Sequence, residues 1–347
     1  MTGQAPLGVA YLASGELERL LAPWRSGILG GICYGTVAGS PPGGDWPLAS
    51  IPAPRLDVRP QGARDLCEVW LGAGPVTQGH VEGIAYRCSD DLLFGVVRQD
   101  EDPSYPASRA PLQGAAQRAY RRVFDLIDAL GYPSLVRAWN YFADINRADQ
   151  GLERYRHFNA GRQDAFLAAG RSLDAGVPAA CALGVGGQPL TIAFLAARGT
   201  VVAIENPRQV SAYCYPPEYG PRSPTFSRAT LVKVAGQPVL FVSGTASIAG
   251  HETRHPGDPV AQTGESLANL QAVLEAANRI VEGPVLTLSQ AYLKVYLRHP
   301  EHLDAVRGVL VQALGEPLKA LFLQAEICRS DLLVEIEATV GPPVMTP

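Results

Sequence analysis

Lysine is scarce in this sequence: only three of the 29 basic residues are lysines, and the other 26 are arginines. A basic excess is also missing, because the formal net charge is −4. A nucleic-acid-binding protein normally offers a basic face to phosphates, so we expect no nucleic-acid partner. A GC-rich coding sequence is the simplest explanation of the arginines. Their planar guanidinium groups would equally suit a site that binds carboxylates, and only their positions can decide.

Long apolar runs are absent as well. The runs at 177–185 and 190–197 are far shorter than the ~20 residues of a membrane span. The N-terminus MTGQAPLGVAYLASGELERLL has no cationic segment before a long apolar one, so we expect a cytoplasmic protein without a secretory signal. No two cysteines have CxxC spacing, and all six are expected to be reduced thiols: Cys33, Cys67, Cys88, Cys181, Cys214 and Cys328.

Helices and strands are predicted in the same order twice along the chain. The first half contains a hairpin at 83–99, a helix at 112–130, a strand at 135–145 and a helix from about 161. The second contains strands within 229–245, a helix at 263–281 with Thr263 as N-cap, a strand at 289–298, a helix at 302–314, and strands at 319–327 and 331–340. We therefore predict a duplication in an α+β fold of mixed sheets packed with helices.

Two domains are expected from this order, one over 1–175 and one over 176–347. The first 65 residues are rich in Gly and Pro and are expected to wrap a domain rather than form one. Because the chain carries its own repeat, we expect a monomer.

Residues 251–255, His-Glu-Thr-Arg-His, match the HExxH pattern of zinc peptidases. That chemistry needs a helix, so that both histidines lie on one face and bind the metal. Gly250 precedes the motif and Pro256-Gly257 follows it, which predicts a loop. Similarly, Gly184-Val185-Gly186-Gly187 lacks the spacing of a dinucleotide loop. We expect neither a metal nor a cofactor.

An arginine-rich stretch, RAWNYFADINRADQGLERYRHFNAGRQDAFLAAGR, covers 137–171. It contains fewer acids than a solvated helix face normally carries. Two readings remain open here, a site for oxyanions and a surface network of salt bridges. A second stretch, AYCYPPEYGPRSPTFSRAT at 212–230, combines tyrosines and arginines with four prolines, which favours a rigid loop beside a pocket over an ordinary surface loop.

The last predicted strand places Glu335 and Glu337 on one face, because side chains alternate along a strand. Glutamates commonly lie in water. If one of them instead faces a cleft, partial burial would raise its pKa and make it a general acid.

The second half resembles the YjgF/RidA superfamily in VLFVSGTASI (239–248), ESLANLQAVLEAA (265–277) and LLVEIEA (332–338). The longer motifs RAWNYFADIN…GLERYRHFNAGRQDAF and YGPRSPTFSRAT resemble the chorismatases. That resemblance implies duplicated YjgF/RidA-like units, no cofactor, and removal of the enolpyruvyl group of chorismate as pyruvate. It also implies Glu335 as the acid that protonates the enolpyruvyl methylene carbon.

Further site residues follow from the same resemblance. Substrate binding is expected from eight positions: Arg154, Tyr155, Arg162, Tyr213, Tyr215, Arg222, Thr245 and Ala246. Members that form 3-hydroxybenzoate are similar to this chain in having a cysteine seven residues before the glutamate, here Cys328, although Cys328 could equally be a buried packing residue. The product expected is 3-hydroxybenzoate. Hydrolysis to a dihydroxycyclohexadienoate, a mixed 3-/4-hydroxybenzoate output, and a YjgF-type metabolite-binding or imine-deaminating protein remain alternatives.

Overall fold

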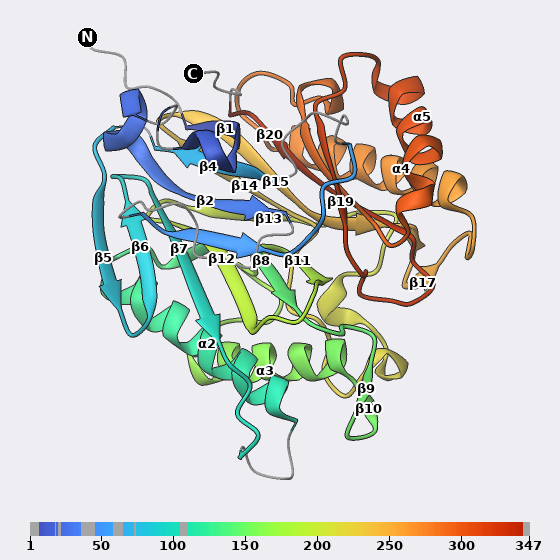
Figure 1. The fold of residues 1–347 in the computed structure, drawn as a ribbon, viewed down its shortest axis with the longest axis horizontal. Coiled ribbons are helices and arrows are strands. Elements are labelled where there is room, and N and C mark those ends of the chain that lie inside the picture. Colours follow the sequence, from blue (N-terminus) through green and yellow to red (C-terminus); the bar gives the residue numbers. More distant parts are fainter. Residues whose placement is uncertain are drawn as a thin grey trace.

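The computed structural model describes residues 7–17, 19, 22–35, 46–57, 65–72, 74–104 and 110–342. Two six-stranded mixed sheets and a four-stranded sheet form most of this part, with helices packed on the larger sheets (Figure 1). None of the helices described combines the length and the apolar character that a membrane crossing requires.

The first six-stranded sheet has the strand order β5-β6-β7-β12-β8-β11, in which β8 and β11 run parallel. Its strands are β5 (Thr77–Val81), β6 (Ile84–Cys88), β7 (Leu92–Gln99), β8 (Ser134–Phe142), β11 (Ala179–Gly184) and β12 (Leu190–Ala197). Two helices connect them, α2 (Pro111–Ala129) before β8 and α3 (Arg154–Ala168) after it. A short pair, β9 (Ala148–Asp149) and β10 (Leu152–Glu153), precedes α3.

The second six-stranded sheet repeats this arrangement strand for strand. Its order is β13-β14-β15-β20-β18-β19, and here β18 and β19 are the parallel pair. The strands are β13 (Val201–Ile204), β14 (Ala229–Val234), β15 (Gln237–Ala246), β18 (Tyr292–Leu297), β19 (Ala320–Gln324) and β20 (Val334–Val340). Helices α4 (Pro259–Asn278) and α5 (Leu303–Leu314) take the places of α2 and α3. The predicted duplication and the α+β class are confirmed.

Each pair of helices covers the outer face of its own sheet, and the inner faces of the two sheets share a core (Figure 1). Strand β8 shows how the alternation of side chains produces these layers. Its Ala138 and Phe142 pack under α2 and α3, whereas Trp139 and Tyr141 point into the shared core. Polar groups carried by inner faces are therefore buried between the two units.

Two helices begin earlier than the sequence predicts. Helix α3 starts at Arg154 rather than near 161. Helix α4 starts at Pro259, and its N-cap is Asp258, whose side chain accepts hydrogen bonds from the backbone N–H groups of residues 260 and 261. The prediction of Thr263 as the cap was wrong: its hydroxyl donates to the carbonyl of Pro259 inside the first turn (2.6 Å). Proline is well suited to this first position because it has no N–H to satisfy there.

The N-terminal segment forms a sheet of its own, which corrects the expectation that it only wraps a domain. Its strands are β1 (Gly8–Ala13), β2 (Ile28–Tyr34), β3 (Leu48–Ile51) and β4 (Leu66–Leu71), in the order β1-β4-β2-β3. Apolar side chains of this sheet enter the core shared by the two larger sheets. The first six-stranded sheet extends to Ala197, beyond residue 175, and the division of the chain into domains at that residue stays a prediction.

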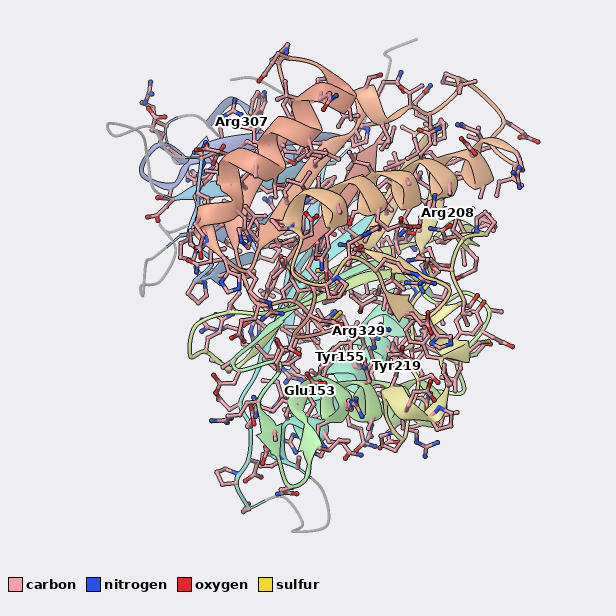
Figure 2. All side chains as sticks on the ribbon, turned by 90° about the vertical axis from the view of Figure 1, so that its right-hand side faces the viewer. Glu153, Tyr155, Arg208, Tyr219, Arg307 and Arg329 are labelled. Carbon is pink, nitrogen blue, oxygen red and sulfur yellow. A yellow bond between two sulfur atoms is a disulfide. The ribbon has the colours of Figure 1, made fainter. Side chains whose placement is uncertain are left out.

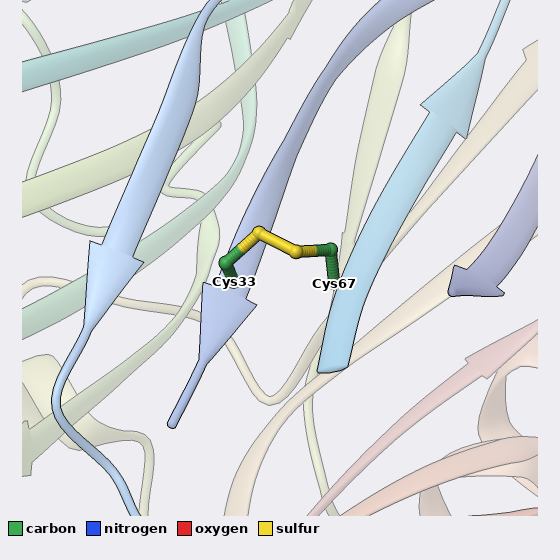
Figure 3. Close-up of a disulfide and its surroundings, with 2 residues drawn as sticks. All are labelled: Cys33 and Cys67. Atoms are coloured by element: carbon green, nitrogen blue, oxygen red, sulfur yellow. A yellow bond between two sulfur atoms is a disulfide. The ribbon is translucent and has the colours of Figure 1, made fainter. Parts of the chain in front are cut away.

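Cys33 on β2 and Cys67 on β4 form a disulfide (Figure 3). The expectation of six reduced thiols was therefore wrong for this pair, while Cys88, Cys181, Cys214 and Cys328 are free. The two cysteines lie 34 positions apart, and the antiparallel register of β2 and β4 places them directly opposite each other. Sequence spacing alone does not contain this register.

Candidate active site

A cavity of about 280 Å³ opens where the two duplicated units meet. Its walls come from the start of α3, the loop between β13 and β14, strand β15, and the segment that leads into β20. A narrow inner extension of about 30 Å³ reaches β11 and is lined by Arg162 and Cys181. The cavity and its extension share five residues: Tyr155, Phe226, Gly244, Cys328 and Glu335. Figure 2 shows Glu153, Tyr155, Tyr219 and Arg329 close together in the middle of the molecule.

Glu335 reaches the cavity because of the alternation along β20. Val334 and Ile336 pack under α4 and α5, so Glu335 and Glu337 point the other way, between the units. Neither glutamate lies in water, since each is only 3% exposed. Only Glu335 lines the cavity.

The surroundings of Glu335 favour its protonated form. Burial, followed by the nearby negative charge of Glu337, raises the pKa of Glu335 to about 8, although Arg137 acts in the opposite direction. Its Oε1 atom has no hydrogen-bond partner among the described residues. Glu335 is thus a neutral acid at pH 7, with its proton available to a molecule in the cavity.

Glu337, in contrast, is ionised. Burial alone would raise its pKa, but Lys294 and Arg137 outweigh burial and lower it to about 2. Its Oε2 lies 2.9 Å from a guanidinium nitrogen of Arg137 and 3.2 Å from Nζ of Lys294, and Trp139 Nε1 donates to it at 3.0 Å. Glu337 is therefore an ion-paired carboxylate that does not reach the cavity.

A β-bulge in β15 brings the backbone close to the acid. The pairing of β15 with β20 shifts register between Val242 and Thr245, beside Glu335. Gly244 lies in this bulge, and a Cβ added there would overlap the carboxyl group of Glu335 and approach Cys181. Ala246 lines the cavity, whereas Thr245 donates its hydroxyl to the carbonyl of Ser243 (2.8 Å) and is not among the lining residues.

Cys328 and Tyr155 flank the acid as neutral groups. Burial, followed by the negative charge of Glu335, raises the pKa of the Cys328 thiol to about 12. Burial likewise raises the pKa of Tyr155 above its ordinary value. Together with Phe226 they form the part of the wall that offers little to bind a water molecule.

Three arginines at the cavity form no ion pair among the described residues, although the charge of Arg228 acts on the nearby carboxyl group of Glu205. Arg162 is 2% exposed, packs against aromatic rings including Phe158, and has a long hydrogen bond to Asn159 (3.4 Å). Arg228 donates to the carbonyl of Val210 (2.7 Å) and to the hydroxyl of Tyr215 (2.9 Å), and Tyr215 also lines the cavity.

The third of these arginines is Arg329, which donates to the carbonyl of His251 (2.9 Å) and stacks on Tyr219. Arginines that line a cavity without forming an ion pair with the protein indicate that the ligand is an anion.

Besides Thr245, three of the predicted binding residues do not line the cavity. Arg154 is buried and paired with Glu101, with Nη1 3.0 Å from Oε2, and its Nε donates to a backbone carbonyl. Arg222 is half exposed and lies 3.9 Å from Asp164. Tyr213 packs against the core beneath α2 and α3. Arg154 and Arg162 lie eight residues apart, or ~12 Å along the helix, so one arginine can be structural while the other faces the ligand.

Arg329 and Tyr219 are lining residues that the sequence analysis did not single out as binding residues. Arg329 could have been predicted from the sequence, because it directly follows Cys328 on the segment that leads to Glu335.

The HExxH segment folds as a short hairpin, where its flanking residues predict a loop. Strands β16 (Ile248–Ala249) and β17 (Glu252–Thr253) pair there, and His255 has a left-handed φ of 54°. The helix that the zinc motif requires is not formed. Nowhere in the described part of the chain do three or more His, Cys, Asp or Glu side chains gather as metal ligands would.

Comparison with known proteins gives a consistent picture. Residues 68–196 match the model of the family "Chorismatase FkbO/Hyg5-like, N-terminal". A "Chorismatase" of Streptomyces rapamycinicus is 42% identical over 298 residues, covering 83% of this chain and 86% of that protein. A "3-hydroxybenzoate synthase" of Streptomyces hygroscopicus is 37% identical over 345 residues, covering 95% and 96%. The crystal structure of a chorismatase superimposes with a TM-score of 0.85 at 37% identity, covering 97% and 98%.

Proposed function

Since the chain belongs to the chorismatase family, we propose that it removes the enolpyruvyl group of chorismate as pyruvate, with Glu335 as the general acid. One observation carries this proposal: a buried glutamate whose pKa is raised to about 8 faces a cavity in which three arginines form no ion pair within the described part of the chain. Chorismate is a dianion that contains an enol ether. It therefore offers carboxylates for the arginines and a carbon atom for the proton of Glu335.

The proton of Glu335 goes to the methylene carbon of the enolpyruvyl group. The new C–H bond uses the π electrons of the enol, so positive charge develops on the carbon that carries the ether oxygen. Cleavage of the bond between that oxygen and the ring then releases pyruvate, because the bonding electrons complete its carbonyl group. The ring carbon that loses the ether oxygen is left electron-deficient. The oxygen of the adjacent ring hydroxyl bonds to this carbon to give an arene-oxide-like intermediate, and the hydroxyl proton returns to the carboxylate of Glu335. Isomerisation of this intermediate to the phenol then gives 3-hydroxybenzoate without a further reactant. General acid catalysis of this kind contributes typically ~10²–10⁴-fold.

The arginines hold the two carboxylates apart along the cavity. Arg162 is at the inner end, close to Glu335, whereas Arg228 and Arg329 are at the wider part. Two fixed anchors would orient the enol ether toward the acid, which raises the rate by positioning. A generic metabolite-binding or imine-deaminating protein has no need of three such arginines, so the site favours a dedicated dianion pocket.

The product proposed is 3-hydroxybenzoate. Together, 3-hydroxybenzoate and pyruvate contain the same atoms as chorismate, so no water is consumed. Cys328, Tyr155 and Phe226 surround the acid with neutral, weakly hydrating surface, which supports a reaction without water. Hydrolysis to the dihydroxycyclohexadienoate would instead require a water molecule beside the reacting ring. A 3-/4-hydroxybenzoate mixture is the further possible output.

A single chain supplies every element of this site, from α3 of the first unit to β20 of the second. We therefore propose a monomer as the active species, working without metal or cofactor.

Incubation with chorismate in D₂O tests the proposal. We expect 3-hydroxybenzoate and pyruvate in equal amounts by chromatography, with one deuterium in the pyruvate methyl group, because the acid exchanges its proton with solvent. Trapping pyruvate as lactate during the reaction prevents later exchange. Unchanged chorismate, or pyruvate without deuterium, would overturn the proposal. Dihydroxycyclohexadienoate with deuterated pyruvate would keep the acid and change the product.

A further inference from the structure

Beneath Glu335 lies a cluster of four buried charged side chains that comes from all three sheets. Arg137 lies on β8, Lys294 on β18, Glu337 on β20, and Glu68 on β4 of the N-terminal sheet. Each is at most 4% exposed. Charges removed from water to this degree must compensate one another, and here two cations face two anions.

Glu68 joins this cluster through Lys294. Its carboxyl oxygens lie 3.4 Å from Nζ of Lys294, and Nζ in turn lies 3.2 Å from Oε2 of Glu337. Trp70 Nε1 and the Tyr11 hydroxyl also donate to Glu68, at 3.0 and 3.2 Å. Because all these neighbours are donors, they suit a carboxylate that accepts hydrogen bonds and carries a negative charge.

The net charge of this cluster affects the ionisation of Glu335, which is the next carboxyl group on the same face of β20. With Glu335 neutral, the two cations and the two anions cancel. Ionisation of Glu335 would add a third negative charge without a third cation. Removal of Glu68 would leave one cation uncompensated, and that cation would stabilise the carboxylate form of Glu335.

We propose that Glu68 is a positioning residue of the active site, which acts through Lys294 on the charge balance below Glu335 and so helps to keep the acid protonated. This inference rests on the proposed role of Glu335, and it assigns a function to the N-terminal sheet. Lys294 responds to both carboxylates: burial lowers its pKa, but Glu337 and Glu68 together raise it above its ordinary value.

Other ionisable groups also face Glu335 from the elements packed around it. They are Glu337 on β20, Arg137 on β8, Cys181 on β11, Glu153 on β10, Tyr155, Arg156 and Arg162 on α3, Tyr215, Tyr219 and Arg228 before β14, and Cys328, Arg329 and Asp331 before β20. None of them is altered by a substitution at Glu68. The neutral isostere Gln at position 68 also keeps an oxygen to accept from Trp70.

The test is a titration of Glu335 that does not depend on turnover. The C=O stretch of its protonated carboxyl group is followed by infrared difference spectroscopy from pH 5 to pH 10, and the band is assigned by its loss in Glu335→Gln. In Glu68→Gln the midpoint should fall by about one pH unit, because a negative charge has been removed. Glu282→Gln, an exposed glutamate paired with Lys233, removes the same charge at the surface and should leave the midpoint in place.

Lys294→Met should shift the titration midpoint of Glu335 in the opposite direction. It therefore gives a second measurement in case the Glu68→Gln variant does not fold. It removes a cation, so the midpoint should rise, and adding Glu68→Gln to it should change the midpoint little, because Glu68 acts through Lys294. A midpoint insensitive to Glu68→Gln in the wild-type background, or an equal fall without Lys294, would overturn the inference, even in a fully active chorismatase. If no chorismate were consumed but these shifts were observed, the proposed function would fail while the charge coupling stood.

Discussion

Glu335 and Glu337 lie two residues apart on one face of β20, at the same depth of burial. Arg137 and Lys294 contact Glu337 directly, whereas Oε1 of Glu335 has no partner among the described residues. At the scale of single residues, the proposed reaction depends on this difference, because the general acid needs a carboxyl group that keeps its proton at neutral pH.

Replacement of Glu335 by Gln should lower kcat by at least about 100-fold, since the neutral amide cannot donate a proton to the substrate. The wild-type kcat should fall on the alkaline side with a midpoint near 8, where the acid loses its proton, and that limb should vanish in the variant. Steady-state kinetics over pH 5–10 measure both effects. Chorismate affinity, measured by calorimetry, should change little. Retained turnover would remove the carboxyl group from the mechanism.

Arg162 and Arg154 form a matched pair on α3. Arg162→Ala should weaken apparent chorismate affinity by well over tenfold, because loss of one partner of a buried charge pair typically costs ~2–5 kcal/mol. Arg162→Lys should also bind poorly, since an ammonium group does not reproduce the guanidinium fork. Arg154→Ala should instead lower the melting temperature and leave KM nearly unchanged, because Arg154 is paired with Glu101. A higher KM only for Arg154→Ala would reverse this assignment.

Cys328→Ala should shift the products from 3-hydroxybenzoate toward the dihydroxycyclohexadienoate. The smaller side chain opens room for water beside Glu335, where the neutral thiol now lies. Chromatography of the products gives the ratio. An unchanged ratio at normal turnover would make Cys328 a packing residue only.

The sequence predicted the orientation of Glu335 and Glu337 well and the groups around them less well. Alternation along the last strand was enough to place both glutamates on one face. Their different charges were not predictable, because the two cations responsible, Arg137 and Lys294, lie on other strands and are remote from Glu337 in sequence. Such contacts depend on which sheets pack together, and local sequence patterns do not predict the packing of sheets.

At the scale of elements, the residues on either side of a motif predicted its secondary structure better than the motif itself did. The HExxH segment was expected to be a loop because of Gly250 and Pro256, and it is a hairpin. The start of α3 was placed too late because its first turn, RYRHFN, contains almost no aliphatic residues. This turn is nevertheless buried at Arg154 and His157, so tertiary contacts take the place of an amphipathic pattern.

The hairpin geometry leads to a prediction about metals. Exhaustive treatment with a chelator should leave chorismate turnover unchanged, because the two histidines of the motif do not share a helix face. His255→Ala should likewise keep wild-type kinetics, as His255 is exposed and does not line the cavity. Elemental analysis of the active protein checks the first part. Stoichiometric zinc, with turnover lost on its removal, would contradict it.

At the scale of the whole molecule, the duplication was visible in the order of elements, but the N-terminal sheet was not. Its strands GVAYLA, ILGGICY and LCEVWL are short and separated by Gly- and Pro-rich segments, which favoured a wrapping segment. The sheet forms because its apolar face completes the core between the units. It also brings Glu68 and Tyr34 to Lys294, so a segment without a recognisable motif contributes to the charge cluster of the site.

Because Glu337 and Glu335 are buried with shifted pKa values, the free energy of unfolding depends on pH in two separate pH ranges. The pKa of Glu337 is lowered in the folded protein to about 2, so its contribution is present above its ordinary value of 4.5 and is lost as the pH falls toward 2. The pKa of Glu335 is raised to about 8, so its contribution is present below 4.5 and is lost as the pH rises toward 8.

Glu335→Gln should therefore stabilise the protein above pH 5 while it lowers kcat. The neutral amide has no proton to lose, so the free energy of unfolding of the variant should stay flat between pH 5 and pH 8, where that of the wild type declines. The difference should reach roughly 3–5 kcal/mol at pH 8 and shrink toward pH 5. Urea unfolding followed by circular dichroism at both pH values measures it. Below pH 4.5 both proteins should lose stability together, because both retain Glu337. Parallel curves from pH 5 to pH 8 would mean that Glu335 is already ionised in the folded protein, and it could then not be the acid that protonates chorismate.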